Sequence, residues 1–315
     1  MFAPHGGRRY LRVGMDELRD AVQEAVGRTY ALERELGGGG MSRVFMAHDE
    51  GLDRPVVVKV LLPELASGVS AQRFAREVRA AATLQHPHIV PVLFAGHTAA
   101  EIPFYVMPYV RGETLRERLA RAPIHFAESS AVLGDVAKAL GAAHSVGLVH
   151  RDVKPDNVLL CGGAAVVTDF GIAHAMHDAR TAAGDSRLTM LHTSLGTPAY
   201  LAPEQAAGDE IDARADVYSW GVVSYEMTAG RHPFGEASSA QRMIAAHISQ
   251  RPRPLVPASV GAPAWFCALV MRCLAKDPSA RPTDGAALVH ALEEEQGGKS
   301  LLARYTAGVR RMFGA

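Results

Sequence analysis

Residue types suited to handling phosphate gather in one stretch of the sequence. His150–Asn157 reads His-Arg-Asp-Val-Lys-Pro-Asp-Asn, and Asp169-Phe170-Gly171 follows shortly after it. Burying carboxylates, an amide and a lysine among apolar strand formers costs several kcal/mol unless each group has a partner. A metal ion and an anionic substrate would supply such partners. These residues therefore predict a site for phosphate transfer.

Two short strands are expected to position this stretch. Val158–Leu160 and Val166–Val167 are apolar and are separated by the Gly162-Gly163 turn, which is typical of a hairpin. His150–Asn157 then precedes one strand, and Asp169 follows the next. The two carboxylates are expected to converge at one end of the hairpin.

A run of glycines, Gly37–Gly40, joins the predicted strands Tyr30–Leu36 and Val44–His48. A Walker A loop would need Gly-Lys-Ser/Thr before a helix, and a dinucleotide fingerprint would also pass from strand into helix. Here the glycines join strand to strand. Their backbone N–H groups can approach phosphate oxygens without interference from Cβ atoms. The pattern indicates a hairpin whose tip lies over an anion.

Lys59 interrupts the otherwise apolar strand Arg54–Leu62. A lysine in such a run needs a partner for its ammonium, unless the strand is an edge strand with the lysine on its surface. Glu77 lies at the margin of the apolar face of the predicted helix Ser70–Leu84 and is the candidate partner.

Composition is that of an ordinary globular protein. The chain has 315 residues, enough for one large domain or two lobes, and 33 basic residues balance 33 acidic ones, which gives no support for a nucleic-acid partner. Cys161, Cys267 and Cys273 form no CxxC pair and indicate reduced thiols. Neither a secretory signal nor a membrane span of about 18 to 20 apolar residues is found, so a cytoplasmic location is expected.

Changes in residue pattern along the chain, between strand-like and helix-like stretches, predict four segments. Strands are expected at Ile89–Phe94 and Phe104–Met107, and mainly helices follow Gly112. A helix from Asp16 is interpreted as a loosely packed extension or as a docking or dimerisation helix. The last segment is basic and amphipathic, and it would either dock or form a frayed surface helix. The predicted segments are an N-terminal extension (1–28), a first lobe (29–110), a second lobe (111–296) and a C-terminal tail (297–315).

Taken together, these motifs resemble the protein kinase family over residues 30 to 296, and most of all its bacterial members of the eukaryotic Ser/Thr type. The resemblance rests on Gly37-x-Gly39-x-x-Ser42-x-Val44, Val58-Lys59, Glu77, His150–Asn157, Asp169–Gly171, Ala202–Glu204, Asp216 and Arg281. It implies a bilobal α+β fold. A small antiparallel β-sheet with one main helix would form the N-lobe, and a larger helical C-lobe would follow.

The resemblance also implies roles for individual residues. Asp152 would orient the substrate hydroxyl and accept its proton, and Lys154 would neutralise charge on the moving γ-phosphoryl group. Asp169 and Asn157 would bind Mg²⁺, with Mn²⁺ as an alternative. The residues expected around ATP are Leu36, Gly37, Gly38, Gly39, Gly40, Met41, Ser42, Val44, Val57, Lys59, Glu77, Met107, Pro108, Val110, Leu159 and Asp169.

Family patterns favour Ser/Thr over Tyr substrates. Lys154 stands two positions after Asp152, and Thr197 precedes Pro198-Ala199-Tyr200, where its hydroxyl would bridge Asp152 and Lys154. Asp156 and Glu226 match positions that hold substrate arginines in some relatives. Glu204 and Arg281 match a structural ion pair.

Arg151 beside the catalytic aspartate implies control by phosphorylation. A phosphate on Thr189 or Thr193 would bring about two negative charges to its guanidinium. The expected partners are protein substrates, the chain itself in trans among them, and a homodimer is compatible with this. A pseudokinase that acts as a nucleotide-binding regulatory module is the alternative, and small-molecule phosphotransferases are a third class.

Overall fold

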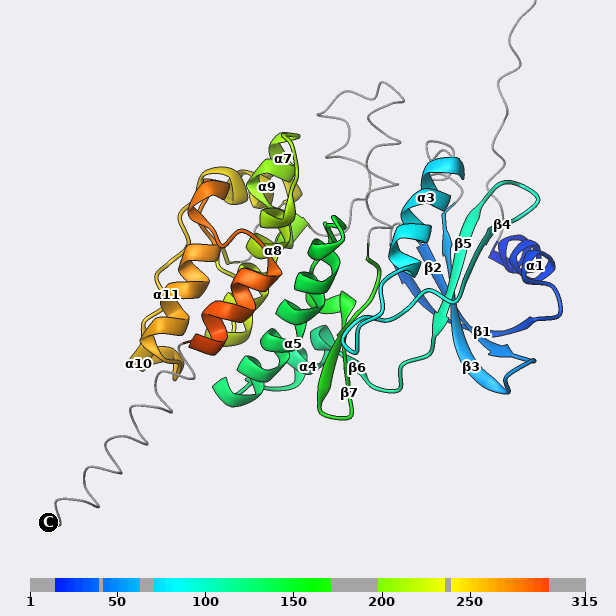
Figure 1. Ribbon diagram of the computed structural model, residues 1–315, viewed down its shortest axis with the longest axis horizontal. Helices are drawn as coiled ribbons and strands as arrows, with labels where there is room; N and C mark the ends of the chain where they lie inside the picture. Colours follow the sequence, from blue (N-terminus) through cyan, green and yellow to red (C-terminus); the bar gives the residue numbers. More distant parts are fainter. Residues whose placement is uncertain (1–14, 40–41, 63–70, 171–197, 236–238, 295–315) are drawn as a thin grey trace, which may run out of the picture. The chain divides into compact units, whose positions relative to one another are not determined.

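The computed structural model describes residues 15–39, 42–62, 71–170, 198–235 and 239–294, which Figure 1 draws in colour. The chain divides into two compact units. Among the described residues, the first unit holds those up to Ala82 together with Pro91–Tyr109, and the second holds the remainder. Predictions for Gly40, Met41, Thr189, Thr193, Thr197 and the 297–315 tail lie outside the described residues.

The first unit is built on a five-stranded antiparallel sheet in the order β1-β2-β3-β5-β4. Two helices, α1 (Met15–Val26) and α3 (Ala71–Ala82), accompany it (Figure 1). The predicted hairpin around the glycines is confirmed, because β1 pairs antiparallel with β2. The strands are β1 (Tyr30–Gly39), β2 (Ser42–Asp49), β3 (Arg54–Leu61), β4 (Phe94–His97) and β5 (Pro103–Pro108).

Alternation along β3 assigns its side chains to two faces of the sheet. Val56, Val58 and Val60 belong to one buried cluster with Leu18, Val22 and Val26 of α1. Val57 and Lys59 therefore point to the opposite face. Helix α3 lies on that face, where the ring of Phe74 contacts that of His97 at 5.8 Å between centroids.

Helix α1 is an integral part of the first unit. Val22 is 0% exposed. The Gln23 amide accepts a hydrogen bond from Leu32 N over 2.8 Å and donates to Tyr30 O over 3.0 Å, while Arg19 donates to Leu32 O over 3.2 Å. The expected loose packing of this extension is therefore wrong, because its apolar stripe and two polar side chains are both engaged by β1.

The fourth strand is displaced from its predicted position. A strand was expected at Ile89–Phe94, but β4 begins only at Phe94, and Ile89 makes an isolated bridge to Val167. Pro91 explains the difference, because a proline has no N–H to give to a ladder and strand interiors exclude it.

The second unit combines a small sheet with helices. Its sheet has the order β6-β7-β8. Helix α8 is buried on nearly every side. The indole of its Trp220 is fully buried and donates to Leu133 O over 3.0 Å. The elements are β6 (Glu113–Thr114), α4 (Leu115–Arg121), α5 (Phe126–Ser145), β7 (Val158–Cys161), β8 (Ala164–Val167), α7 (Pro203–Ala207), α8 (Ala213–Ala229), α9 (Ala240–Ser249), α10 (Pro257–Val260), α11 (Ala264–Cys273), three 3₁₀ turns (Pro155–Asn157, Pro198–Tyr200, Pro278–Ala280) and helical residues 285–294.

Close packing of α11 on α8 depends on Gly221. A Cβ atom there would stand 2.7 Å from Cys273 Cβ, so glycine permits the approach. The predicted α+β architecture, a small antiparallel sheet with one main helix and a larger helical part, is confirmed. Among the described helices, none combines the length and the hydropathy needed to cross a bilayer.

Candidate active site

Both predicted catalytic residues and the predicted metal ligand Asn157 meet in the loop before β7. Asp152 Oδ2 accepts hydrogen bonds from Lys154 Nζ over 2.7 Å and from Asn157 Nδ2 over 3.0 Å. The same Asn157 nitrogen also donates to Asp152 O over 2.8 Å. The loop therefore presents a carboxylate, an ammonium and an amide as one hydrogen-bonded group.

The β7–β8 hairpin brings Asp169 next to this group. Val158 pairs with Val167, and Thr168 N donates to Asn157 O over 3.0 Å. Asp169 follows directly, so its backbone and that of Asn157 lie at the same end of the hairpin, as the two-strand pattern predicted.

His150 links the loop before the hairpin to the segment after it. Its fully buried ring accepts from Asp152 N at Nδ1 over 3.2 Å and is hydrogen-bonded through Nε2 to Thr168 O over 2.9 Å. Because Nδ1 accepts, the proton is on Nε2 and that nitrogen donates. The ring also packs edge-on against Phe170 at 4.5 Å between centroids, so His150 holds the two segments together by an apolar contact as well as by polar ones.

The carboxylate of Asp216 in α8 holds the backbone of the same loop. It accepts from His150 N and Arg151 N, each over 2.7 Å, and from His144 Nε2 over 2.8 Å. Burial by itself would raise the pKa of Asp216, but the hydrogen bonds and charge of His144 and the amide of His150 hold its pKa below the ordinary value. The buried group is thus an anion that holds the backbone beside the catalytic aspartate.

Two residues of the site adopt left-handed backbone conformations. The φ angles of Arg151 and Asp169 are 68° and 69°. Such angles are unfavourable for residues with a Cβ and persist only where the surroundings enforce them. At Arg151, Asp216 holds the amide, and Gln205 Nε2 donates to the carbonyl over 2.9 Å.

Asn157 and Asp169 are suited to hold Mg²⁺. Carboxylate and amide oxygens are the hard ligands that this ion prefers, and it usually keeps waters and substrate phosphates in the rest of its shell. In the part of the chain that the structure describes, no group of three or more His, Cys, Asp or Glu side chains is placed to bind a metal.

In the first unit, residues predicted to surround the nucleotide share one face of the sheet. Lys59 pairs with Val44 on one side and Tyr105 on the other, and Val57 pairs with Met107. Directly paired residues point to the same side, and this side carries α3. Glu77 of α3 is 7% exposed, and Arg76 lies 3.8 Å from its carboxylate.

Two glycines of the hairpin are required by its geometry. Gly37 has a φ of 140°, and a Cβ on Gly38 would stand 2.7 Å from Ser42 O. Both observations fit a tip in which the backbone itself is the binding surface. The structure places the other predicted residues at the end of β1 (Leu36, Gly39), in β2 (Ser42), at the end of β5 (Pro108), at the start of the second unit (Val110) and in β7 (Leu159).

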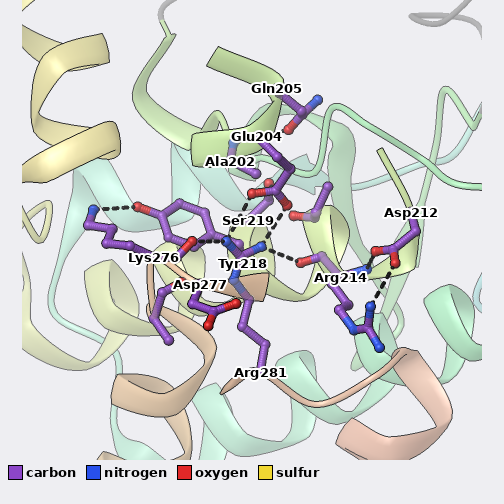
Figure 2. A network of polar contacts seen from close by, with 12 residues as sticks. Ala202, Glu204, Gln205, Asp212, Arg214, Tyr218, Ser219, Lys276, Asp277 and Arg281 are labelled. Carbon is purple, nitrogen blue, oxygen red and sulfur yellow. Dashed lines mark hydrogen bonds and ion pairs between the residues drawn. The ribbon is translucent and has the colours of Figure 1, made fainter. Parts of the chain in front are cut away.

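The predicted structural ion pair is present in the second unit. Arg281 donates to Glu204 through Nη1 over 2.6 Å and through Nη2 over 2.9 Å. Figure 2 shows the pair within a network that also reaches the backbone of Arg214. Both residues are buried, so the pair joins α7 to the segment before the last helix.

Arg116 engages the acidic pair Asp156 and Glu226. Arg116 of α4 lies 2.9 Å from Glu226 and 3.7 Å from Asp156, and Tyr200 OH contacts both Arg116 and Glu226. The chain's own arginine thus contacts both carboxylates, and their match to substrate-arginine positions stays a prediction. No sequence signal marked Arg116, because it is far from both partners along the chain.

These arrangements define a protein kinase domain. A family model described as "Protein kinase domain" matches residues 30–293, and the chain belongs to this family. It is similar to bacterial Ser/Thr kinases. It is 40% identical over 287 residues to the Corynebacterium efficiens "Serine/threonine-protein kinases drp72", and the match covers 88% of this chain and 52% of that protein. It is 42% identical over 258 residues to the Mycobacterium tuberculosis "Serine/threonine-protein kinase PknB", and the match covers 80% of this chain and 40% of that protein.

Solved structures agree with this assignment. The crystal structure of the M. tuberculosis PknI kinase domain matches with a TM-score of 0.66 and 29% identity, over 85% of this chain and 96% of that one. The chain spans about half or less of the length of the curated relatives named above, since it covers 52% and 40% of them. Family and fold are therefore shown for the domain.

Proposed function

We propose that the chain is a protein-serine/threonine kinase that transfers the γ-phosphoryl group of ATP to Ser and Thr hydroxyls of proteins. The observation that carries the proposal is the hydrogen-bonded group of Asp152, Lys154 and Asn157, with Asp169 at the same end of the hairpin. The names of the similar bacterial kinases support the same substrate class.

Asp152 is assigned the role of base. Lys154 and Asn157 both donate to its Oδ2, so Oδ1 is the oxygen assigned to accept the proton of the substrate hydroxyl. The Lys154 ammonium, 2.7 Å from that carboxylate, offers positive charge to the phosphoryl group in transit. Mg²⁺ held by Asp169 and Asn157 would neutralise the phosphate charge.

Regulation is proposed to act through Arg151. Its amide and carbonyl are held by Asp216 and Gln205 in a strained conformation next to Asp152. A second copy of the chain would place a phosphate on Thr189 or Thr193 in trans. That phosphate would pair with the Arg151 guanidinium and order the segment between Arg151 and the phosphorylated threonine. ATP as phosphoryl donor fits a cytoplasmic site of action.

Phosphate incorporation from radiolabelled ATP into myelin basic protein tests the activity. Asp152→Asn keeps the shape of the side chain and removes the base, so we expect a loss of about 10²-fold or more. Asp209→Asn, on an exposed residue, is the matched control and should retain the wild-type rate. Equal incorporation by wild type and Asp152→Asn would refute the catalytic assignment. Nucleotide binding without incorporation by wild type would favour the pseudokinase alternative.

Mass spectrometry after incubation with Mg-ATP tests the regulatory part. Phosphate is expected on Thr189 or Thr193 of the wild type and on neither residue of Asp152→Asn. A wild type that phosphorylates the basic protein but carries no phosphate between Gly171 and Thr197 would contradict autophosphorylation while leaving the kinase proposal intact.

A further inference from the structure

One carbonyl in the second unit accepts hydrogen bonds from two histidines. Ala199 O lies 2.6 Å from His232 Nε2 and 2.9 Å from His247 Nε2. Ala199 is the middle residue of the 3₁₀ turn Pro198–Tyr200, His232 follows α8, and His247 is in the last turn of α9. A carbonyl oxygen has two lone pairs, so both imidazoles can donate to it at once.

The other ring nitrogens determine that both histidines are donors. His232 Nδ1 accepts from Phe234 N over 3.3 Å. His247 Nδ1 lies 3.0 Å from Tyr218 OH, and Lys276 Nζ donates to the same phenolic oxygen over 3.2 Å (Figure 2). Because a carbonyl oxygen can only accept, His247 Nε2 donates to Ala199 O, and Nδ1 of the neutral ring accepts the Tyr218 hydroxyl proton. Each imidazole therefore carries its proton on Nε2, toward Ala199.

Burial keeps both rings neutral. It lowers the pKa of His247 to about 3, and it lowers the pKa of His232 as well. One donor is enough to satisfy a buried carbonyl, so a second histidine on the same oxygen is more than solvation of the peptide group requires. The presence of this second donor indicates that the two imidazole rings control the position of the Pro198–Tyr200 turn.

The turn is connected to the catalytic loop by a short path. Ala202 N donates to Gln205 Oε1 over 3.0 Å, and Gln205 Nε2 donates to Arg151 O over 2.9 Å, directly before Asp152. The next residue of the turn is held too, because Ser219 Oγ donates to Tyr200 O over 2.7 Å. The turn that the histidines hold is therefore followed, two residues later, by a backbone group that Gln205 links to the residue before Asp152.

We propose that His232 and His247 are positioning residues that, through Ala199 O, hold the Pro198–Tyr200 turn in place for the polypeptide substrate. The two histidines set the affinity of the domain for protein substrate and leave its affinity for nucleotide unchanged. This proposal rests on the proposed kinase function and adds to it the residues that position its substrate.

The test compares the full chain with His232→Leu, which removes the donor, and His232→Gln, whose amide can still donate. His232 is partly exposed, so its variants are the ones that carry the test, and His247→Gln is added for the second ring. His125→Leu, on an exposed residue, is the control. The readouts are KM for myelin basic protein, KM for ATP, and the dissociation constant of myelin basic protein by calorimetry.

We expect His232→Leu to raise KM and the dissociation constant for the basic protein by about tenfold, with KM for ATP within about twofold of wild type. His232→Gln and His247→Gln should stay within about threefold of wild type on all readouts, like the control. Nitrogen-15 chemical shifts of the wild-type imidazoles should show the proton on Nε2.

Each contrary result has one meaning. An active wild type whose KM for the basic protein is unchanged in His232→Leu, or a protein that does not bind the basic protein at all, overturns the positioning role. An inactive wild type refutes the proposed function instead, and the dissociation constants then still decide whether the histidines position the polypeptide.

Discussion

His144 donates a hydrogen bond from Nε2 to the Asp216 carboxylate over 2.8 Å, and the backbone N of Gly285 donates to its Nδ1 over 3.0 Å. The histidine thereby joins three helical segments, α5, α8 and residues 285–294, beneath the loop that carries Asp152. The catalytic loop consequently depends on a buried network that reaches Asp216 and Gly285, which lie far from the loop in sequence.

Asp216→Asn should weaken this network without changing its volume. An amide can replace only one of the two carboxylate oxygens as an acceptor, and its NH₂ group would face a backbone N–H. We expect a loss of about 2 to 4 kcal/mol in the free energy of unfolding, measured by urea denaturation, and a lower kcat. Asp209→Asn serves as the exposed control. A variant with wild-type stability would show that the hydrogen bonds to His150 N and Arg151 N contribute nothing.

The Glu204–Arg281 pair should respond asymmetrically to substitution. Arg281 also donates to Ala275 O, Lys276 O and Arg214 O, at 2.8, 3.0 and 3.0 Å. Among the residues that the structure describes, the Glu204 carboxylate accepts hydrogen bonds from this arginine alone. Arg281→Met should therefore destabilise the protein by more than Glu204→Gln does, with about 3 to 5 kcal/mol for the arginine variant.

Thermal and urea unfolding of both variants check this order, beside Arg251→Met at an exposed position. Equal losses for Arg281→Met and Glu204→Gln would mean that the three backbone carbonyls find other donors.

Helix α1 should be needed for the stability of the first unit. Val22 is fully buried against the sheet, so Val22→Ala should cost about 1 to 3 kcal/mol through lost burial and a small cavity. Glu24→Ala, on the exposed side of the same helix, should be neutral. If hydrogen exchange in β1 and β3 were as slow in Val22→Ala as in wild type, the helix would be dispensable.

The buried histidines predict sensitivity to acid. Burial holds the pKa of His247 at about 3, whereas a histidine in the unfolded chain titrates near 6.5, so below that pH the unfolded chain binds a proton that the folded chain does not. The contribution of His247 to the free energy of unfolding is fully present above about pH 6.5. On acidification below that pH, this contribution falls by up to about 1.4 kcal/mol per pH unit.

Denaturation in urea at a series of pH values between 7.5 and 4.5 measures that slope, and His247→Gln should flatten it. Asp216 does not interfere in this range, because a carboxylate with a lowered pKa loses its contribution only below the ordinary value of 3.8. Identical slopes in wild type and His247→Gln would show that another group controls the acid response.

Local sequence determined much of this domain. The glycines between two apolar strands predicted the hairpin, and the order of His150–Asn157, two short strands and Asp169 predicted that the carboxylates meet at one end of β7 and β8. Those relationships hold because neighbours in sequence are neighbours in a hairpin, where register follows from alternation.

Contacts between distant segments were decided only by the tertiary structure. Because of Pro91, β4 begins only at Phe94 and runs to His97. Helix α1 is part of the core because Val22 packs against the sheet. The side chains that hold Asp152 in place, Asp216 through the backbone and Gln205 through Arg151 O, carry no motif that states their partners. Ala199 O meets His232 and His247 for the same reason: a buried polar group takes whichever partner the packed fold brings to it.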